Sequence, residues 1–421
     1  MLIARVHEWE QQMTGIDHGD MFVGRQVRVI RARRGLTQQV LADRVGVSRG
    51  AIAKYEAGER PIDSRKLLHA LAAALSVDIG DLTGHEHERL GAPATAFHAA
   101  VPEIETAFWT AGNITDVAPA RRTDSLIDAS KHAARLQMEC EYATLAPLLP
   151  ALLTDLYRRT RDGSPADQHA AWDALAQVAF STSIAMRARG YTAVAWSAAQ
   201  EAERAAQMID SLPGHAAATF ARSQVLLSRP GALKAALDCV EDTAERISSD
   251  VRTVGEVQTL GMLHLQASLV TAASGGDPEA HLDEAAEQAA RLDKATASAA
   301  SILGNPTFGS PNVALWKMSA AMEVRDADAV LHLARQLDPH TLPTAGRTAQ
   351  YFVEVGRAAS MKRNYPASIH ALLRAEHIAP QQVRNMTHVR ELVGHTMRKA
   401  RRNLTTGDLG RLAQRVGVVP A

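Results

Sequence analysis

The chain has 421 residues but only two cysteines, Cys140 and Cys239. They lie far apart and in no spacing typical of metal ligands, which excludes a disulfide framework and fits a reducing cytosol. Aromatic residues are also scarce, at 4%, whereas 46% of residues are apolar and most of these are alanine and leucine, which favour helices. No window shows the strict alternation of a half-buried strand. We therefore predict an all-α protein.

Signals for export and for membrane insertion are missing. The N-terminus has no positively charged segment followed by an apolar run. The longest charge-free run, 295–316, is interrupted by Gly304, Pro306 and Gly309, so it would make a poor membrane helix. We expect a cytoplasmic protein without a membrane partner.

Catalytic patterns are missing as well. The sequence has no glycine-rich phosphate loop with a lysine, no G-x-S-x-G and no H-E-x-x-H. The His/Glu alternation at 85–88 places two histidines on different faces of any helix, so we interpret it as part of a polar linker over 85–104 rather than a metal site. We expect no enzyme activity, no cofactor and no metal.

Charge is concentrated in one short part of the chain. The net charge is zero, yet residues 21–84 hold eleven lysines and arginines against six acidic residues. One basic module on a near-neutral chain predicts a local contact with a polyanion.

Residues 35–55 within this module have the pattern of two short helices around a tight turn. Thr37 can cap a helix whose inward residues are Val40, Leu41 and Val45, and Gly46 supplies the turn. A third helix follows, capped by Ser48 with Ile52 and Tyr55 inward; the preceding helix buries Val27 and Ile30 and ends at Gly35.

The segment LTQQVLADRVGVSRGAIAKYEAGERPI, followed by LLHALAAALSVDIGDLTG, resembles the Xre/Cro/phage-repressor family of five-helix, lambda-repressor-like DNA-binding domains. The resemblance implies a buried ion pair between Arg31 and Glu56. It also implies a set of DNA-contacting residues, which we take to be Gln38, Ser48, Arg49, Gly50, Lys54, Arg33 and Arg34. Because Gly50 has no side chain, base readout would depend on Arg49 and Lys54. Two alternatives are a helical hairpin with solvated charges and a DNA-binding fold reused for protein contact.

One such module reads few base pairs, and members of the family normally dimerise. We therefore expect a homodimer on double-stranded DNA with an inverted-repeat operator. Its dimer contacts would come from elsewhere in the chain, because the module shows no spare apolar face.

Residues 105–421 have the pattern of helix pairs. Breaks rich in glycine, proline, asparagine and aspartate recur about every 40 to 50 residues, at 190–191, 229–231, 275–277, 325–327 and 364–366. Small residues and these turns resemble degenerate tetratricopeptide repeats. We expect five or six pairs in a right-handed superhelical solenoid, closed by a tail helix with Leu409, Leu412 and Val416 inward. The alternative is a helical bundle without repeats.

The stretch 308–315, FGSPNVAL, resembles a segment of actinobacterial Xre-type regulators. We place Phe308, Asn312 and Trp316 on the concave surface as candidate effector contacts, because an asparagine can pair with a peptide backbone through both its donor and its acceptor. The alternative is that Asn312 only caps a helix.

These observations predict four regions: an extension at 1–20, either a short helix or a misannotated start; a DNA-binding domain at 21–84; the linker at 85–104; and an effector and dimerisation domain at 105–421. The predicted function is transcriptional regulation in response to a peptide or small molecule. Alternatives are an antitoxin-like autorepressor and a protein-interaction scaffold.

Overall fold

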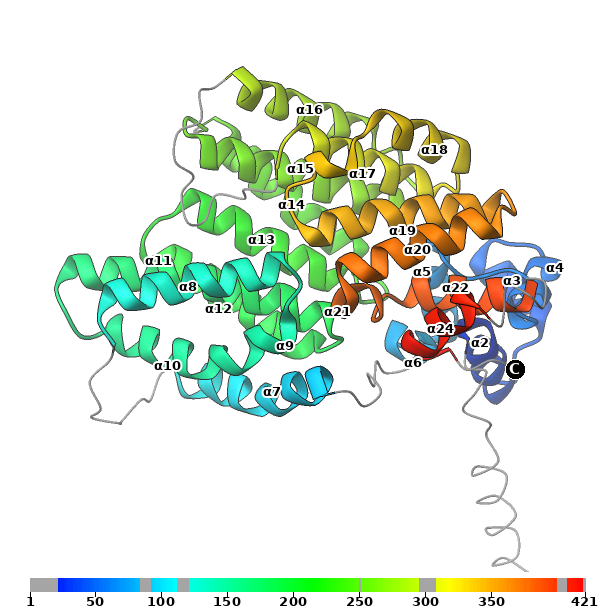
Figure 1. Ribbon diagram of the computed structural model, residues 1–421, viewed down its shortest axis with the longest axis horizontal. Coiled ribbons are helices and arrows are strands. Elements are labelled where there is room, and N and C mark those ends of the chain that lie inside the picture. Colours follow the sequence, from blue (N-terminus) through cyan, green and yellow to red (C-terminus); the bar gives the residue numbers. More distant parts are fainter. Residues whose placement is uncertain are drawn as a thin grey trace, which may run out of the picture.

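The structure is a computed structural model, which describes residues 22–83, 92–111, 121–249, 251–294, 308–399 and 407–418. Every regular element in these ranges is a helix (Figure 1), which confirms the all-α prediction. None of the described helices is both long and apolar enough to cross a membrane. The predicted extension at 1–20 lies outside the described residues.

Residues 22–83, which we call the head, contain five helices. They are α2 (Val23–Arg33), α3 (Gln38–Val45), α4 (Arg49–Glu56), α5 (Arg65–Leu75) and α6 (Ile79–Thr83). Their common core is apolar and fully enclosed, and includes Val27, Leu41, Ile52, Leu71 and Leu75. The five-helix register predicted from the sequence is confirmed.

Local signals set the ends of the head helices. The Thr37 hydroxyl accepts the Val40 N–H at 3.2 Å, and Ser48 accepts the Ala51 N–H at 3.1 Å. Gly46 between them has φ +74°, a conformation that costs little only for glycine. The expectation that Val40 points inward is wrong: it is 38% exposed, because α3 buries Leu41 and Ala42 and Val40 lies outside that face.

Most of the remaining chain, which we call the body, consists of helix pairs. The pairs are α11 (Pro165–Ala188) with α12 (Thr192–Met208), α13 (Leu212–Leu226) with α14 (Leu233–Ser248), α15 (Val254–Ser274) with α16 (Glu279–Lys294), α17 (Ser310–Glu323) with α18 (Ala327–Gln336), and α19 (Ala345–Met361) with α20 (Tyr365–Ile378). Each of the five predicted breaks falls at the turn between the two helices of a pair, and the last two extend into the start of the second helix.

Other helices flank the pairs. Before them come α7 (Ala92–Thr110), α8 (Thr123–Met138), α9 (Tyr142–Leu145), η2 (Ala146–Leu148) and α10 (Leu149–Arg159). Within and after them lie η3 (Pro339–Thr341), α21 (Pro380–Val383), α22 (Thr387–Lys399) and α24 (Asp408–Arg415). The tail helix α24 buries Leu409 and Leu412, and Val416 directly after it is buried as well, as predicted.

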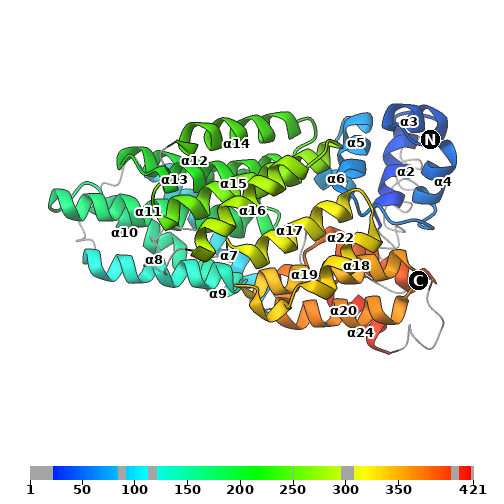
Figure 2. The ribbon, with the colours of Figure 1, turned by 90° about the horizontal axis from the view of Figure 1, so that it is seen from above.

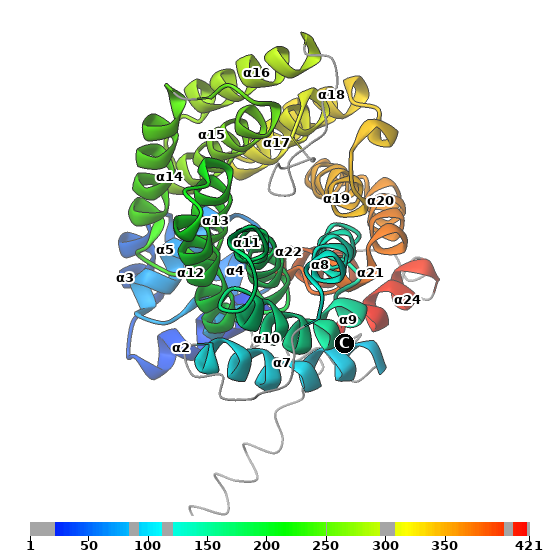
Figure 3. The same ribbon diagram turned by 90° about the vertical axis from the view of Figure 1, so that its left-hand side faces the viewer.

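The pairs form a two-layered, curved solenoid. The first helices of successive pairs contact one another, α11 with α13, α13 with α15, α15 with α17 and α17 with α19. In Figure 3 the pairs follow one another around a common centre from α11 to α20. Small residues allow close crossings: Ala179, Ala202 and Ala218 from three neighbouring helices form a buried cluster. The handedness of the superhelix stays a prediction.

The linker predicted over 85–104 is wrong from residue 92 onward. Residues 92–110 form α7, which contains Pro102 and fully buries Phe97 and Ile104 against the first helices of the body. The prolines and small residues suggested a loop, but burial of the apolar face stabilises a helix there. Residues 84–91, with the His/Glu run, lie outside the described residues.

Candidate nucleic-acid interface and central cavity

The exposed edge of α4 carries the residues predicted to read DNA. Arg49, Gly50 and Lys54 are exposed, and Ser48 caps the helix at its exposed N-terminus. Helices α3 and α4 lie at the outer end of the molecule, away from the body (Figure 2). The edge is therefore open to a duplex, and an arginine and a lysine beside a glycine suit close approach to base edges.

Arg31, Gln38 and Glu56 form one hydrogen-bonded group beneath this edge. Arg31 donates to the two carboxylate oxygens of Glu56 at 2.5 and 2.9 Å, and Gln38 Nε2 donates to Glu56 Oε2 at 2.8 Å. Hydrogen bonding to Glu56 raises the pKa of Arg31. The ion pair joins α2 to α4, and it also holds the first residue of α3, so that the amide of Gln38 is oriented by Glu56.

Arg33 and Arg34 end α2 and are both exposed. Arg34 Nη2 donates to the backbone oxygen of Ser76 at 2.9 Å, across to the end of α5. Arg34 thus links the ends of α2 and α5. Arg33 is an exposed cation beside it.

Ion pairs fasten the loop 57–65 of the head to the body. Arg65 donates through its backbone N–H at 2.8 Å and its guanidinium at 2.6 Å to Glu323 at the end of α17. Asp63 pairs with Arg325, and its backbone oxygen accepts from Arg357 Nη2 on α19 at 2.6 Å. The sequence separations are 258 to 294 residues, so no local pattern could show these contacts.

Two further contacts hold other faces of the head. The Val23 N–H, at the start of α2, donates to Glu391 of α22 at 2.7 Å. On α5, the His69 ring is 2.8 Å from the Leu227 oxygen at the end of α13. The head therefore also contacts the second helix pair and the helix α22, which follows the last pair.

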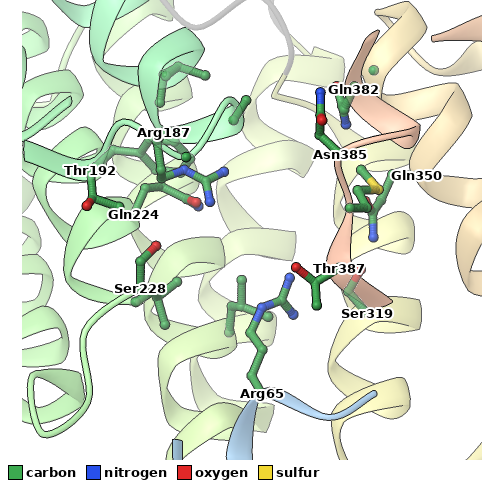
Figure 4. Close-up of a pocket in the computed structure, with 18 of the residues that line it drawn as sticks. Arg65, Arg187, Thr192, Gln224, Ser228, Ser319, Gln350, Gln382, Asn385 and Thr387 are labelled. Carbon is green, nitrogen blue, oxygen red and sulfur yellow. The ribbon is translucent and has the colours of Figure 1, made fainter. Parts of the chain in front are cut away.

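A cavity of about 650 Å³ lies between the solenoid and the head. Every first helix of a pair contributes lining residues, and the head contributes a further set, including Arg65 and His69. Figure 4 shows Arg187 and Gln224 on one side, Gln350, Gln382 and Asn385 on the other, and Arg65 from the head below. The wall combines amide, guanidinium and hydroxyl groups with apolar side chains such as Phe220 and Leu315. A mixture of apolar surface and polar groups that can orient a ligand is typical of sites for small organic molecules.

Of the three candidate effector contacts, only Trp316 lines this cavity. Phe308 is buried against Gly261, where an added Cβ would lie 2.0 Å from the phenyl ring. Asn312 is 1% exposed and donates to Met262 Sδ at 3.4 Å, and the cap of α17 is Gly309. Phe308 and Asn312 therefore do not reach the cavity, and capping by Asn312 is also wrong.

The other lining residues do not stand out in the sequence. Arg187, Gln224 and Gln350 stand at inward positions of helices whose outward faces are also polar, so composition does not set them apart. A search for polar residues on the apolar faces of the first helices would have found them.

Comparison with known proteins supports the head. A family model described as a helix-turn-helix domain matches residues 23–85. Over 70 residues, 17% of this chain, it is 37% identical to a propionyl-CoA carboxylase regulator of Cereibacter sphaeroides and 41% identical to an uncharacterized transcriptional regulator in the ATPase CF(0) region of Rhodospirillum rubrum. These matches span 15% and 64% of the relatives' own lengths. Residues 23–85 are a helix-turn-helix domain.

A solved structure is similar over a longer range but only loosely. The crystal structure of Bacillus thuringiensis PlcR in complex with the peptide PapR7 and DNA covers 82% of this chain and 99% of its own, with 11% identity and a TM-score of 0.31. A similarity this slight carries no argument about the body of this chain.

Proposed function

We propose that this protein is a transcriptional regulator that binds double-stranded DNA through its head and is controlled by a ligand in its central cavity. The observation that carries the proposal is that one cavity is lined by the first helix of every pair and by the head itself. A ligand there contacts the DNA-binding module directly. The volume of the cavity suits a short peptide or a small organic molecule.

The head's contacts with the body give the ligand a way to act. Arg65 both lines the cavity and pairs with Glu323. A ligand that binds more tightly to one position of Arg65 than to another shifts the head relative to the solenoid. In a homodimer on an inverted repeat, the spacing of the two heads must match that of the half-sites, so a small shift changes affinity. We also propose that the chain is divided into an extension at 1–20, a DNA-binding domain at 21–84 and a C-terminal effector and dimerisation region.

Arg49→Ala tests the DNA-binding part. Loss of a base-contacting arginine is expected to reduce discrimination between the operator and scrambled DNA by about 1–3 kcal/mol. Fluorescence anisotropy with upstream intergenic DNA, at two salt concentrations, measures this. Arg122→Ala is the control, because Arg122 lies on the body and its side chain is 87% exposed. Equal operator affinity for Arg49→Ala and wild type would remove α4 as the recognition helix, and no sequence-specific binding by wild type would favour a scaffold.

Native mass spectrometry of protein purified from its host tests the ligand. We expect a retained small molecule or peptide that is lost when Ala217→Phe fills part of the cavity wall. Operator affinity is then compared with and without the recovered molecule. If wild type and Ala217→Phe retain the same amount of bound molecule, the cavity is not the binding site. If the molecule leaves operator affinity unchanged, a ligand in the cavity does not control DNA binding.

A further inference from the structure

One end of the cavity concentrates positive charge on α19 and α11. Arg347 and Arg187 both line it, and they are close enough that Arg187 contributes to lowering the pKa of Arg347. Burial is the main cause, and the pKa of Arg347 falls to about 10. The guanidinium of Arg347 stacks over the Trp316 ring, 5.3 Å from its centre. Two neighbouring guanidinium groups favour the binding of an anion beside them.

Trp316 adds an unused donor at the same end. Trp316 is 5% exposed and lines the cavity. Its indole Nε1 has no hydrogen-bond acceptor among the described residues. A buried N–H without an acceptor costs free energy, which an acceptor group on a ligand would recover. Within the described ranges, Trp316 thus presents a hydrogen-bond donor without an acceptor beside the guanidinium of Arg347.

The head contributes a hydrogen-bond acceptor to the cavity wall. His69 is 6% exposed, and its Nε2 is 2.8 Å from the Leu227 carbonyl oxygen, so Nε2 carries the proton. Its Nδ1 has no partner in the described part of the chain and is left as an acceptor. Burial lowers the pKa of His69, which keeps the ring neutral.

We propose that the ligand is an organic anion whose carboxylate or phosphate group binds Arg347 and the Trp316 indole N–H, with Arg187 adding charge, while an N–H or O–H group of the ligand donates to His69 in the head. This inference rests on the proposed ligand-binding function and names the chemistry of its ligand. The ligand would bridge α19 and the head, so its release would remove one link between the head and the body.

Two fluorescent probes of nearly the same shape test the anionic subsite. Anilinonaphthalene sulfonate carries a sulfonate group, and N-phenylnaphthylamine is the same ring system without it. Wild type is expected to bind the sulfonate at least about tenfold more tightly than the neutral probe, as expected for hydrogen bonds to charged groups. Arg347→Gln should remove that preference without weakening the neutral probe.

Arg222→Gln is the matched control. Arg222 also lies over a tryptophan ring, that of Trp196 at 5.9 Å, and is half-buried, but it is not part of the cavity wall. Trp316→Phe keeps the ring and removes the N–H, and should weaken sulfonate binding about three- to tenfold. It also keeps the proposal testable if Arg347→Gln does not fold. Displacement by phenylacetate or by inorganic phosphate then separates a carboxylate from a phosphate ligand.

The outcomes separate the two proposals. Binding of neither probe would overturn the cavity as a ligand site and with it the proposed control. Equal binding of both probes by wild type, or equal loss in Arg347→Gln and Arg222→Gln, would leave the cavity as a site and overturn its anionic subsite.

Discussion

Glu354→Ala is expected to lower the free energy of unfolding by about 3–5 kcal/mol, because it leaves a buried arginine without its carboxylate. Glu354 on α19 is fully buried and accepts from Arg357 at 2.7 Å, from Gln350 at 2.5 Å and from Ser319 at 3.2 Å. Removing it leaves three donors without their acceptor, and one of these donors is the charged guanidinium of Arg357. The shift of the urea midpoint measures the loss.

The same change should loosen the head. Arg357, itself 2% exposed, donates from its other nitrogen to the backbone oxygen of Asp63. Without Glu354 to orient it, that contact weakens, and amide hydrogen exchange at 57–65 should rise while exchange in α11 and α12 stays slow. This pattern distinguishes loss of the head contact from general unfolding.

Two controls bracket the prediction. Asp328→Ala removes an exposed partner of Lys362, in an ion pair between α18 and the end of α19, and should leave the midpoint unchanged. A Glu354→Leu/Arg357→Met double variant replaces the pair by apolar side chains and should recover most of the lost stability. If Glu354→Ala and Asp328→Ala behave alike, the buried pair does not hold the head.

The sequence predicted those parts of the fold that local chemistry determines. The caps at Thr37 and Ser48 and the turn at Gly46 are set within a few residues, so the head's register could be derived. Breaks such as Gly190 and Gly275 likewise end helices by their own left-handed backbone, and they mark the turns between the two helices of a pair.

What the sequence did not predict depends on how distant segments meet. The cavity exists because inward faces of five pairs curve toward the head, and curvature is a sum of small inter-pair angles. The head contacts join residues more than 250 positions apart, such as Arg65 with Glu323. The local pattern of residues 92–104 predicts a linker, because the partners that bury Phe97 come from other parts of the chain.

Glu391→Gln is expected to stabilise the protein at pH 8 by roughly 3 kcal/mol and to have little effect near pH 4.5. Burial raises the pKa of the Glu391 carboxyl from its ordinary value of 4.5 to about 7, and each unit of pKa shift corresponds to about 1.4 kcal/mol. Because the folded-state pKa is the higher one, the protonated group's contribution is fully present below pH 4.5. It is lost as pH rises through 7.

Glutamine removes the titration and keeps the contact, because its amide oxygen still accepts the Val23 N–H that Glu391 accepts at 2.7 Å. Urea midpoints of wild type and Glu391→Gln should therefore diverge between pH 4.5 and 7. Glu376→Gln is the opposite control: Glu376 pairs with Arg384 and Arg415, its pKa is lowered, and its removal should destabilise the protein at pH 8. Parallel pH profiles for wild type and Glu391→Gln would contradict the prediction.

The position of Glu391 connects this titration to the head. Phe22 provides no side-chain cap for α2, so the carboxyl of α22 takes that place from the far end of the chain. Above pH 7 the ionised carboxylate is buried, and the Val23 N–H, Arg398 and Arg390 offset only part of the desolvation cost, because burial still raises the pKa to about 7. The α2 to α22 contact is then the costliest of the head contacts to keep, and it is the one expected to open first as the pH rises, before the Arg65 to Glu323 pair.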